Sequence, residues 1–216
     1  MRVRAASRKL LIGAGVLVGL VLAGNLAILG ASWIARGTTP RIDVAPIRGV
    51  NNLEAVDDKL WRGAAPTPEG YRALAANGVK VIVDLRAEPQ AEADQAIVRS
   101  LGMQSLRLPV RDGQVPTRDQ IDEFLRVTRA GGLTFVHCGA GVGRTGAMAG
   151  SWLVAEGELN GRGAVRRNLA VGPPTLEQVT FVARLDDGYA PRTPGVVTAL
   201  SRVLDAPRRI AHNLGL

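Results

Sequence analysis

The chain has 216 residues, the length of one ordinary domain with additional segments, and its 46% hydrophobic and 21% charged residues exclude wholesale disorder. Its single cysteine cannot form an intramolecular disulfide, so the fold does not depend on oxidation. The net charge is +8, but six of these charges lie in residues 1–41, which contain no acid, and no basic patch interleaved with aromatic residues supports nucleic-acid binding.

The first predicted element is a membrane helix. Residues 10–35 contain no charge and would form about 39 Å of helix, longer than the bilayer core of about 30 Å. A secretory h-region has only about 7–15 residues, and Gly30-Ala31-Ser32 is the best available cleavage site. We therefore predict a basic segment at 1–9 and an uncleaved signal anchor at 10–35, with a cleaved signal peptide as the alternative. The basic flank favours a cytoplasmic N-terminus and a periplasmic or extracytoplasmic catalytic domain.

Small residues recur at every fourth position of this helix. Gly15, Gly19, Ala23 and Ala27 would form one face, which could bring two helices together as a homodimer. The abundance of Gly and Ala in membrane spans is the simpler explanation of the same pattern.

From Leu60 onward, apolar runs alternate with segments of helical periodicity. Strands are predicted at 60–63, 79–85, 104–110 and 133–138, and helices at 67–78, 91–102, 117–132, 144–157, 161–170, 175–186 and 195–206. Thr67 is expected to cap the first helix, and Thr117 with Gln120 to form a capping box. The alternation predicts an α/β domain at 55–190, with a mainly parallel central sheet flanked by helices.

Two further segments flank the domain. Residues 36–54 are rich in Pro and Gly and predict a linker. Residues 191–216 predict a helical tail, in which Val196, Leu200, Val203 and Leu204 share one face. This helix either packs on the core or lies on a membrane surface.

The glycine-rich stretch VHCGAGVGRTG, residues 136–146, lies between the strand at 133–138 and the helix at 144–157. A tight loop at the carboxyl end of a strand and before a helix N-terminus predicts an anion site, because backbone N–H groups converge there. Arg144 adds a planar charged fork suited to phosphate, and we expect the same positive field to favour the thiolate of Cys138. A thiolate beside a bound phosphate can attack phosphorus.

Three other interpretations were weighed. An ATP-type P-loop requires Lys before Ser or Thr, whereas this loop has Arg144 before Thr145. The pattern G-x-G-x-x-G at 141–146 matches a dinucleotide fingerprint, but Arg144 stands where a pyrophosphate must approach the backbone. A buried, inert Cys138 would leave Arg144 and the glycines unexplained.

His137-Cys138-x5-Arg144-Thr145 resembles the HCx5R[S/T] signature of the cysteine-dependent protein tyrosine phosphatases. The full HCGAGVGRTG resembles the dual-specificity and lipid-phosphatase branch, and LWRGAAPTPEGYRALAANGVKVIVDLRAE at 60–88 is similar to atypical dual-specificity phosphatases. The resemblance covers residues 55–190 and implies their fold and phosphatase activity without a cofactor.

The resemblance also implies a role for each residue of the loop. Cys138 would be the nucleophile, Arg144 would bind the phosphoryl oxygens, and the Thr145 hydroxyl would stabilise the thiolate as the phosphocysteine breaks down. His137 would order the loop without touching substrate. The phosphate would be held by the backbone N–H groups of Gly139, Ala140, Gly141, Val142 and Gly143.

The family further requires a general acid from an upstream loop. Asp112 in LPVRDGQVPTRDQ, residues 108–120, is followed by Gly113 and Pro116 and resembles the acid loop of some dual-specificity phosphatases. Asp119 and Asp122 are alternatives inside a predicted helix.

Sequence leaves the substrate open. Aromatic residues make up 4% of the chain and no phosphotyrosine clamp is recognisable, while the loop lacks the lysines typical of phosphatases for highly phosphorylated inositols. We expect a membrane-anchored phosphatase acting on phosphotyrosine or dual-specificity protein substrates. A lipid or inositol phosphate phosphatase is the alternative, and an inactive phosphate-binding scaffold is an alternative of another class. His137, His212 and Cys138 provide no metal-ligand spacing.

Overall fold

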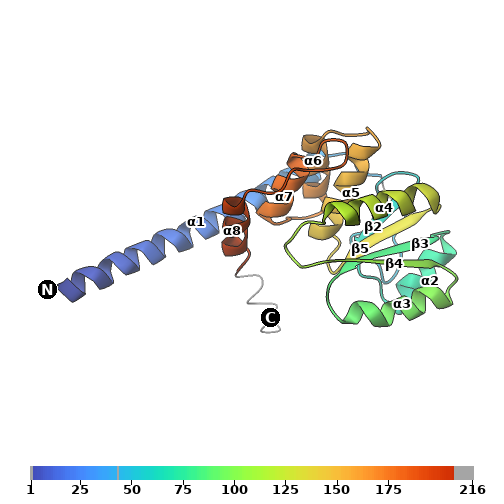
Figure 1. Ribbon diagram of the computed structural model, residues 1–216, viewed down its shortest axis with the longest axis horizontal. Helices are drawn as coiled ribbons and strands as arrows, with labels where there is room; N and C mark the ends of the chain where they lie inside the picture. Colours follow the sequence, from blue (N-terminus) through green and yellow to red (C-terminus); the bar gives the residue numbers. More distant parts are fainter. Residues whose placement is uncertain (1, 43, 207–216) are drawn as a thin grey trace.

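The computed structural model describes residues 2–42 and 44–206, with a long helix projecting from an α/β domain (Figure 1). The elements follow in the order α1 Arg2–Thr38, β1 Glu54–Ala55, β2 Leu60–Ala64, α2 Pro68–Ala76, β3 Val81–Arg86, α3 Gln90–Ser100, β4 Gln104–Val110, α4 Arg118–Ala130, β5 Thr134–Cys138, α5 Gly143–Ala155, α6 Gly161–Val171, α7 Leu176–Ala183 and α8 Gly195–Leu204.

The sheet has the strand order β1-β2-β5-β3-β4. All neighbours pair in parallel except β1, which pairs antiparallel with β2. Every residue of β3 and β5 is buried, because helices cover both faces of a parallel sheet. The predicted fold class, an α/β domain with a mainly parallel sheet, is confirmed.

Two hydrophobic clusters fix the helices to the sheet. Helices α4, α5 and α7 pack on one face around Phe124 and Trp152, and α2 and α3 pack on the other around Tyr71 and Phe135. Successive side chains of a strand point to opposite faces of the sheet, so Val81 and Val83 of β3 join the first cluster and Ile82 joins the second. Because β2, β5, β3 and β4 run parallel, the carboxyl end of β5 lies at the same end of the sheet as those of its neighbours.

Helix starts agree with the capping signals. Thr67 accepts a hydrogen bond from the Gly70 N–H, and Thr117 and Gln120 form the predicted capping box on α4. Strand β1, with only two residues, was not predicted, because so short a run has no detectable period.

Helix α1 packs against the domain over its C-terminal part. The Ser32 hydroxyl donates to the Leu169 carbonyl of α6 over 2.7 Å, Ala35 is buried, and Arg36 donates to the Val171 carbonyl over 3.4 Å. The part Val18–Thr38 is long and apolar enough to cross a membrane, by length and composition. The apolar part of α1 therefore includes the residues that pack on α6.

Part of the segment predicted as a linker packs on the domain, whereas the predicted dimer face is exposed. Ile47 and Val50 of the segment 36–54 are buried against the second cluster. The small residues Gly15, Gly19, Ala23 and Ala27 are exposed, and dimerisation through them stays a prediction. Within the predicted tail, 191–206 contains α8, and 207–216 lie outside the described residues.

Candidate active site

The structure places Cys138 at the carboxyl end of β5, buried to 97% of its surface, with the glycine-rich loop directly after it. Helix α5 begins at Gly143, so the loop of residues 139–142 connects the strand end to a helix N-terminus as predicted. Gly141 has φ +74°, and a Cβ there would lie 2.3 Å from the carbonyl carbon of Gly63 on β2. Only glycine fits this position, both by conformation and by space.

The four carbonyls of residues 139–142 are all held by donors. Ala65 N–H donates to the carbonyl of residue 139 over 3.0 Å, and the Asn52 side chain donates to that of residue 140 over 2.9 Å. Arg62 donates to the carbonyls of residues 141 and 142 over 2.9 and 3.2 Å. In a trans peptide, the N–H of the next residue points opposite to the carbonyl. The N–H groups of residues 140–143 therefore point away from these donors, as an anion cradle requires.

Arg62 is the central donor beneath the loop. Its guanidinium is buried and also donates to the Asn168 side chain of α6 over 3.0 Å. Burial lowers the pKa of Arg62 to about 10, against the raising effect of Glu54, so the side chain stays charged at neutral pH. Sequence reasoning missed it; the detectable signal is one arginine inside an otherwise apolar strand.

Arg144 lies in the first turn of α5, almost fully buried. Its Nη1 donates to both carboxylate oxygens of Glu88 over 3.1 and 3.0 Å and to the Val110 carbonyl over 3.1 Å. Burial lowers the pKa of Arg144, but the nearby Cys138 and the hydrogen bond to Glu88 outweigh burial, and the net shift is upward. Among the described residues, nothing accepts a hydrogen bond from its buried Nε. That N–H is suited to an incoming anion oxygen.

Glu88 is a second residue that sequence reasoning missed. It follows β3, whose carboxyl end lies at the same sheet edge as that of β5. Burial raises the pKa of Glu88, but the hydrogen bond from Arg144 outweighs burial and the net shift is downward. Its position just past a buried strand end was the available signal. The carboxylate orients the Arg144 guanidinium.

Asp112 is brought to the same place by the loop after β4. Its Oδ1 lies 3.4 Å from Arg144 Nη2, while its side chain is half exposed. The loop is fastened to α7 and its cap, since Thr175 donates to the Gly113 carbonyl over 3.0 Å and Gln178 donates to the Gln114 carbonyl over 3.0 Å. The predicted acid and the predicted phosphate ligand are thus adjacent.

The alternative acids lie on α4. Asp119 is in the first turn of that helix, and Asp122 accepts a hydrogen bond from the Tyr189 hydroxyl. Asp122 therefore has a structural partner, and the contact with Arg144 favours Asp112.

His137 and Thr145 lie on either side of the loop. His137 is fully buried, with Nε2 3.3 Å from the Tyr71 hydroxyl and Nδ1 3.3 Å from the Cys138 carbonyl oxygen. Thr145 is also fully buried, and its hydroxyl has no hydrogen-bond partner among the described residues. These surroundings are compatible with the loop-ordering role of His137 and with a thiolate-directed role of the Thr145 hydroxyl.

Burial of His137 predicts a pH-dependent stability. Burial lowers the pKa of His137 against the raising effect of Asp84, so the native imidazole stays neutral where an unfolded histidine takes up a proton. This contribution is fully present above the unfolded pKa and declines as pH falls through it. The free energy of unfolding should fall by up to about 1.4 kcal/mol per pH unit below pH 6.5.

Urea unfolding of the full chain in detergent micelles, followed by tryptophan fluorescence from pH 8 to pH 5, measures this slope. His137→Gln should have a shallower slope, while His212 and the carboxylates are common to both proteins. Parallel profiles would contradict the assignment.

Solved structures show the same fold. P. aeruginosa TpbA, in a variant bound to pTyr, superposes with a TM-score of 0.56 at 19% identity over 77% of this chain and 97% of that one. PTPMT1 in complex with PI(5)P superposes with a TM-score of 0.53 at 17% identity over 73% of this chain and 99% of that one.

Sequence comparison identifies the family. NAD kinase 2, chloroplastic, of Arabidopsis thaliana is 35% identical over 121 residues, which cover 50% of this chain and 12% of that protein. The family model described as a DSP-PTPase phosphatase fused to NAD+ kinase matches residues 44–185, more than half of the chain. These residues include the loop, Arg62, Glu88 and Asp112. The chain therefore belongs to this DSP-PTPase family, within the cysteine-dependent protein tyrosine phosphatase superfamily that its loop motif predicted.

Proposed function

We propose that the chain is a membrane-anchored phosphatase that hydrolyses phosphate monoesters through a phosphocysteine intermediate. The proposal rests on the structure of the loop. Its carbonyls accept hydrogen bonds from Arg62, Asn52 and Ala65, so its N–H groups point the other way, and Cys138 lies at its start. Arg144 supplies buried positive charge at the same place. A dianionic phosphoryl group fits these donors in number and charge.

In the first step, the Cys138 thiolate attacks phosphorus, an S–P bond forms and the ester P–O bond breaks. Asp112 gives its proton to the departing oxygen, so the product leaves as a neutral alcohol or phenol. In the second step, water attacks phosphorus, the S–P bond breaks and Asp112 takes a proton from that water. Thr145 stabilises the departing Cys138 thiolate, and inorganic phosphate is released.

The position of Arg144 supports transition-state binding. Its contacts with Glu88 and Val110 fix the guanidinium before substrate arrives, so little side-chain entropy remains to be lost. The Nε that lacks a partner among the described residues and the loop N–H groups would then face the equatorial oxygens of the transferred group.

We propose phosphotyrosine or dual-specificity protein substrates, with a lipid or inositol phosphate as the second candidate. The matched fold accommodates both chemistries, because TpbA was solved with pTyr and PTPMT1 with PI(5)P. The apolar helix α1 would keep the domain beside a bilayer, which raises the local concentration of phosphorylated membrane proteins and of phosphorylated lipids. An inactive scaffold is disfavoured by the presence of Cys138, Arg144 and Asp112 together.

Replacement of the thiol tests the reaction. Cys138→Ser should abolish phosphate release by the full chain in detergent, because a serine hydroxyl is a poor nucleophile at neutral pH, while inorganic phosphate should still bind. Release is measured from a phosphotyrosine peptide, a phosphoserine peptide, phosphatidylglycerophosphate and a phosphoinositide, with the lipids in vesicles. Equal activity in wild type and variant would exclude the mechanism, and phosphate binding without release by the wild type would favour the scaffold.

Replacement of the acid tests the proton transfer. Asp112→Asn should slow turnover about 100-fold or more for an alkyl phosphate, whose leaving oxygen needs a proton. A nitrophenyl phosphate, whose leaving group is stable as an anion, should be affected much less. Asp119→Asn is the matched control on α4. Equal slowing of both substrates by Asp112→Asn would move the role to another residue.

Replacement of Glu88 tests how Arg144 is held. Glu88→Gln keeps the shape but weakens the bidentate contact, and we expect kcat/KM to fall by up to about 100-fold through misplacement of the guanidinium. Glu92→Gln removes an exposed partner of Arg107 and should leave kcat/KM within about twofold. Wild-type kinetics for Glu88→Gln would show that the charge of Glu88 is not needed to orient Arg144.

A further inference from the structure

Helix α8 has an apolar stripe that faces outward. Val196, Leu200 and Val203 follow helical spacing, and their side chains are 75%, 48% and 39% exposed. The buried residues of the same helix are Ser201 and Leu204. A terminal helix on a water-facing domain normally turns its apolar stripe inward. This arrangement leaves a continuous apolar surface on the outside of α8.

The C-terminal end of α8 is docked on α1. A Cβ at Gly24 would lie 3.0 Å from Leu204 Cδ2, so the glycine admits the leucine side chain. The Asn25 side-chain amide donates to the Leu204 carbonyl over 3.0 Å and to the Val21 carbonyl over 2.9 Å. Leu204 is among the last residues of α8, whose carbonyls have no partner within the helix. The one amide in the apolar part of α1 thus fixes the end of α8.

The position of this contact along α1 corresponds to a membrane boundary. Ser32, Ala35 and Arg36 pack on the domain, so the end of the apolar run beyond about Leu29 is covered by protein. The uncharged run begins at Leu10, and about 20 residues of helix span the hydrocarbon core, which brings its outer limit to about Leu29. Gly24 and Asn25 lie within the last one and a half turns before that limit. Figure 1 shows α8 lying across α1 rather than along it, so α8 would lie along the surface of a bilayer that α1 would span.

The contact with α8 lies at the same level of α1 as several exposed leucines. Leu22, Leu26 and Leu29 of α1 are more than half exposed and lie in the same part of the helix as the α8 contact. Arg192 before α8 is exposed and supplies positive charge at the start of the helix, whereas Arg202 acts on Glu177 of α7, where it opposes the rise in the pKa of that carboxyl caused by burial. An apolar face with a basic residue at its end suits a helix that lies in a membrane interface.

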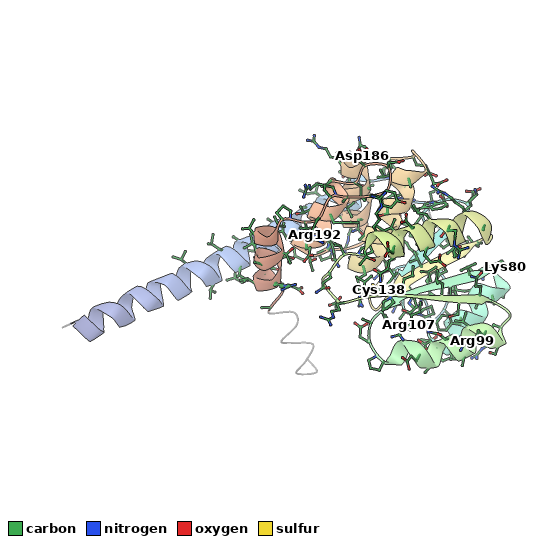
Figure 2. All side chains as sticks on the ribbon, in the orientation of Figure 1. Lys80, Arg99, Arg107, Cys138, Asp186 and Arg192 are labelled. Atoms are coloured by element: carbon green, nitrogen blue, oxygen red, sulfur yellow. The ribbon has the colours of Figure 1, made fainter. Side chains whose placement is uncertain are left out.

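Helix α8 also adjoins the loop that carries Asp112. A Cβ at Gly113 would lie 3.1 Å from Asp205 Oδ2, directly after α8, and the Ser201 hydroxyl accepts from the Glu177 N–H of α7 over 3.0 Å. Figure 2 shows Cys138 on the side of the domain that faces α8. A bilayer that covered the stripe would therefore lie on the side of the domain that carries the acid loop.

We propose that α8 is a second membrane contact, whose stripe of Val196, Leu200 and Val203 is seated among lipid acyl chains next to α1 and holds the catalytic loop toward the bilayer surface. The inference rests on the proposed membrane span of α1. The occupant is lipid rather than a second copy of the chain, because α8 is docked on α1 at Gly24 and Asn25, at the level of the exposed leucines of α1 where the hydrocarbon core would end.

Lipid-dependent quenching tests the proposal on the full chain. Cys138→Ser removes the only thiol, and single cysteines are then introduced by Leu200→Cys on the stripe, Leu20→Cys on the exposed side of α1 and Arg99→Cys on exposed α3. Each is labelled with an environment-sensitive fluorophore and reconstituted into vesicles of phosphatidylcholine and phosphatidylglycerol. A nitroxide on the acyl chains of added lipid serves as the quencher.

We expect the labels at positions 200 and 20 to lose most of their fluorescence and the label at position 99 to keep it. A quenched label at 20 with an unquenched label at 200 would overturn the role of α8 and leave the anchor intact. Unquenched labels at both positions would overturn the membrane span and this inference together. A blue-shifted but unquenched label at 200 would indicate cover by protein, such as a second copy, and would also overturn it. None of these outcomes depends on turnover, so the phosphatase mechanism is tested separately.

Discussion

The buried guanidinium of Arg62 is the constraint on which the catalytic loop depends. A loop that binds an anion through its N–H groups must turn its carbonyls elsewhere, and buried carbonyls without partners are costly. Arg62 satisfies two of these carbonyls from the neighbouring strand and a third acceptor on α6. All three hydrogen bonds come from Nη2, so one end of a rigid guanidinium on β2 joins the loop to α6.

The side chains of the site are likewise held by the ends of neighbouring strands. Arg144 is fixed by Glu88 from the loop after β3 and by the Val110 carbonyl from the end of β4. Asp112 follows two residues after Val110, so the element that orients the guanidinium also carries the proposed acid. The three adjacent strand ends β5, β3 and β4 therefore bring the proposed nucleophile, the orienting carboxylate and the proposed acid to one end of the sheet.

Features with a local cause were predictable from the sequence. The caps at Thr67 and Thr117, the buried strands and the strand–loop–helix context of Cys138 each follow from residues within a few positions of one another. Arg62 and Glu88 were missed because their partners lie 79 and 56 residues away in the chain, and no local pattern encodes such pairings. The two-residue strand β1 and the burial of Ile47 and Val50 were missed for a related reason, since only the tertiary contact defines them.

The contact between α1 and the domain has a consequence for how substrate is reached. Ser32, Ala35 and Arg36 join α1 to α6 without an intervening flexible segment, so the domain has little freedom to swing about α1. In the proposed orientation, the active site would stay at a fixed distance from the lipid surface. Encounter with substrate would then be a two-dimensional search in the plane of the membrane, and the enzyme would act on phosphates at that height while ignoring those farther out. Lengthening the helix between Asn25 and Ser32 by whole turns would change the height and hence which phosphates are accessible.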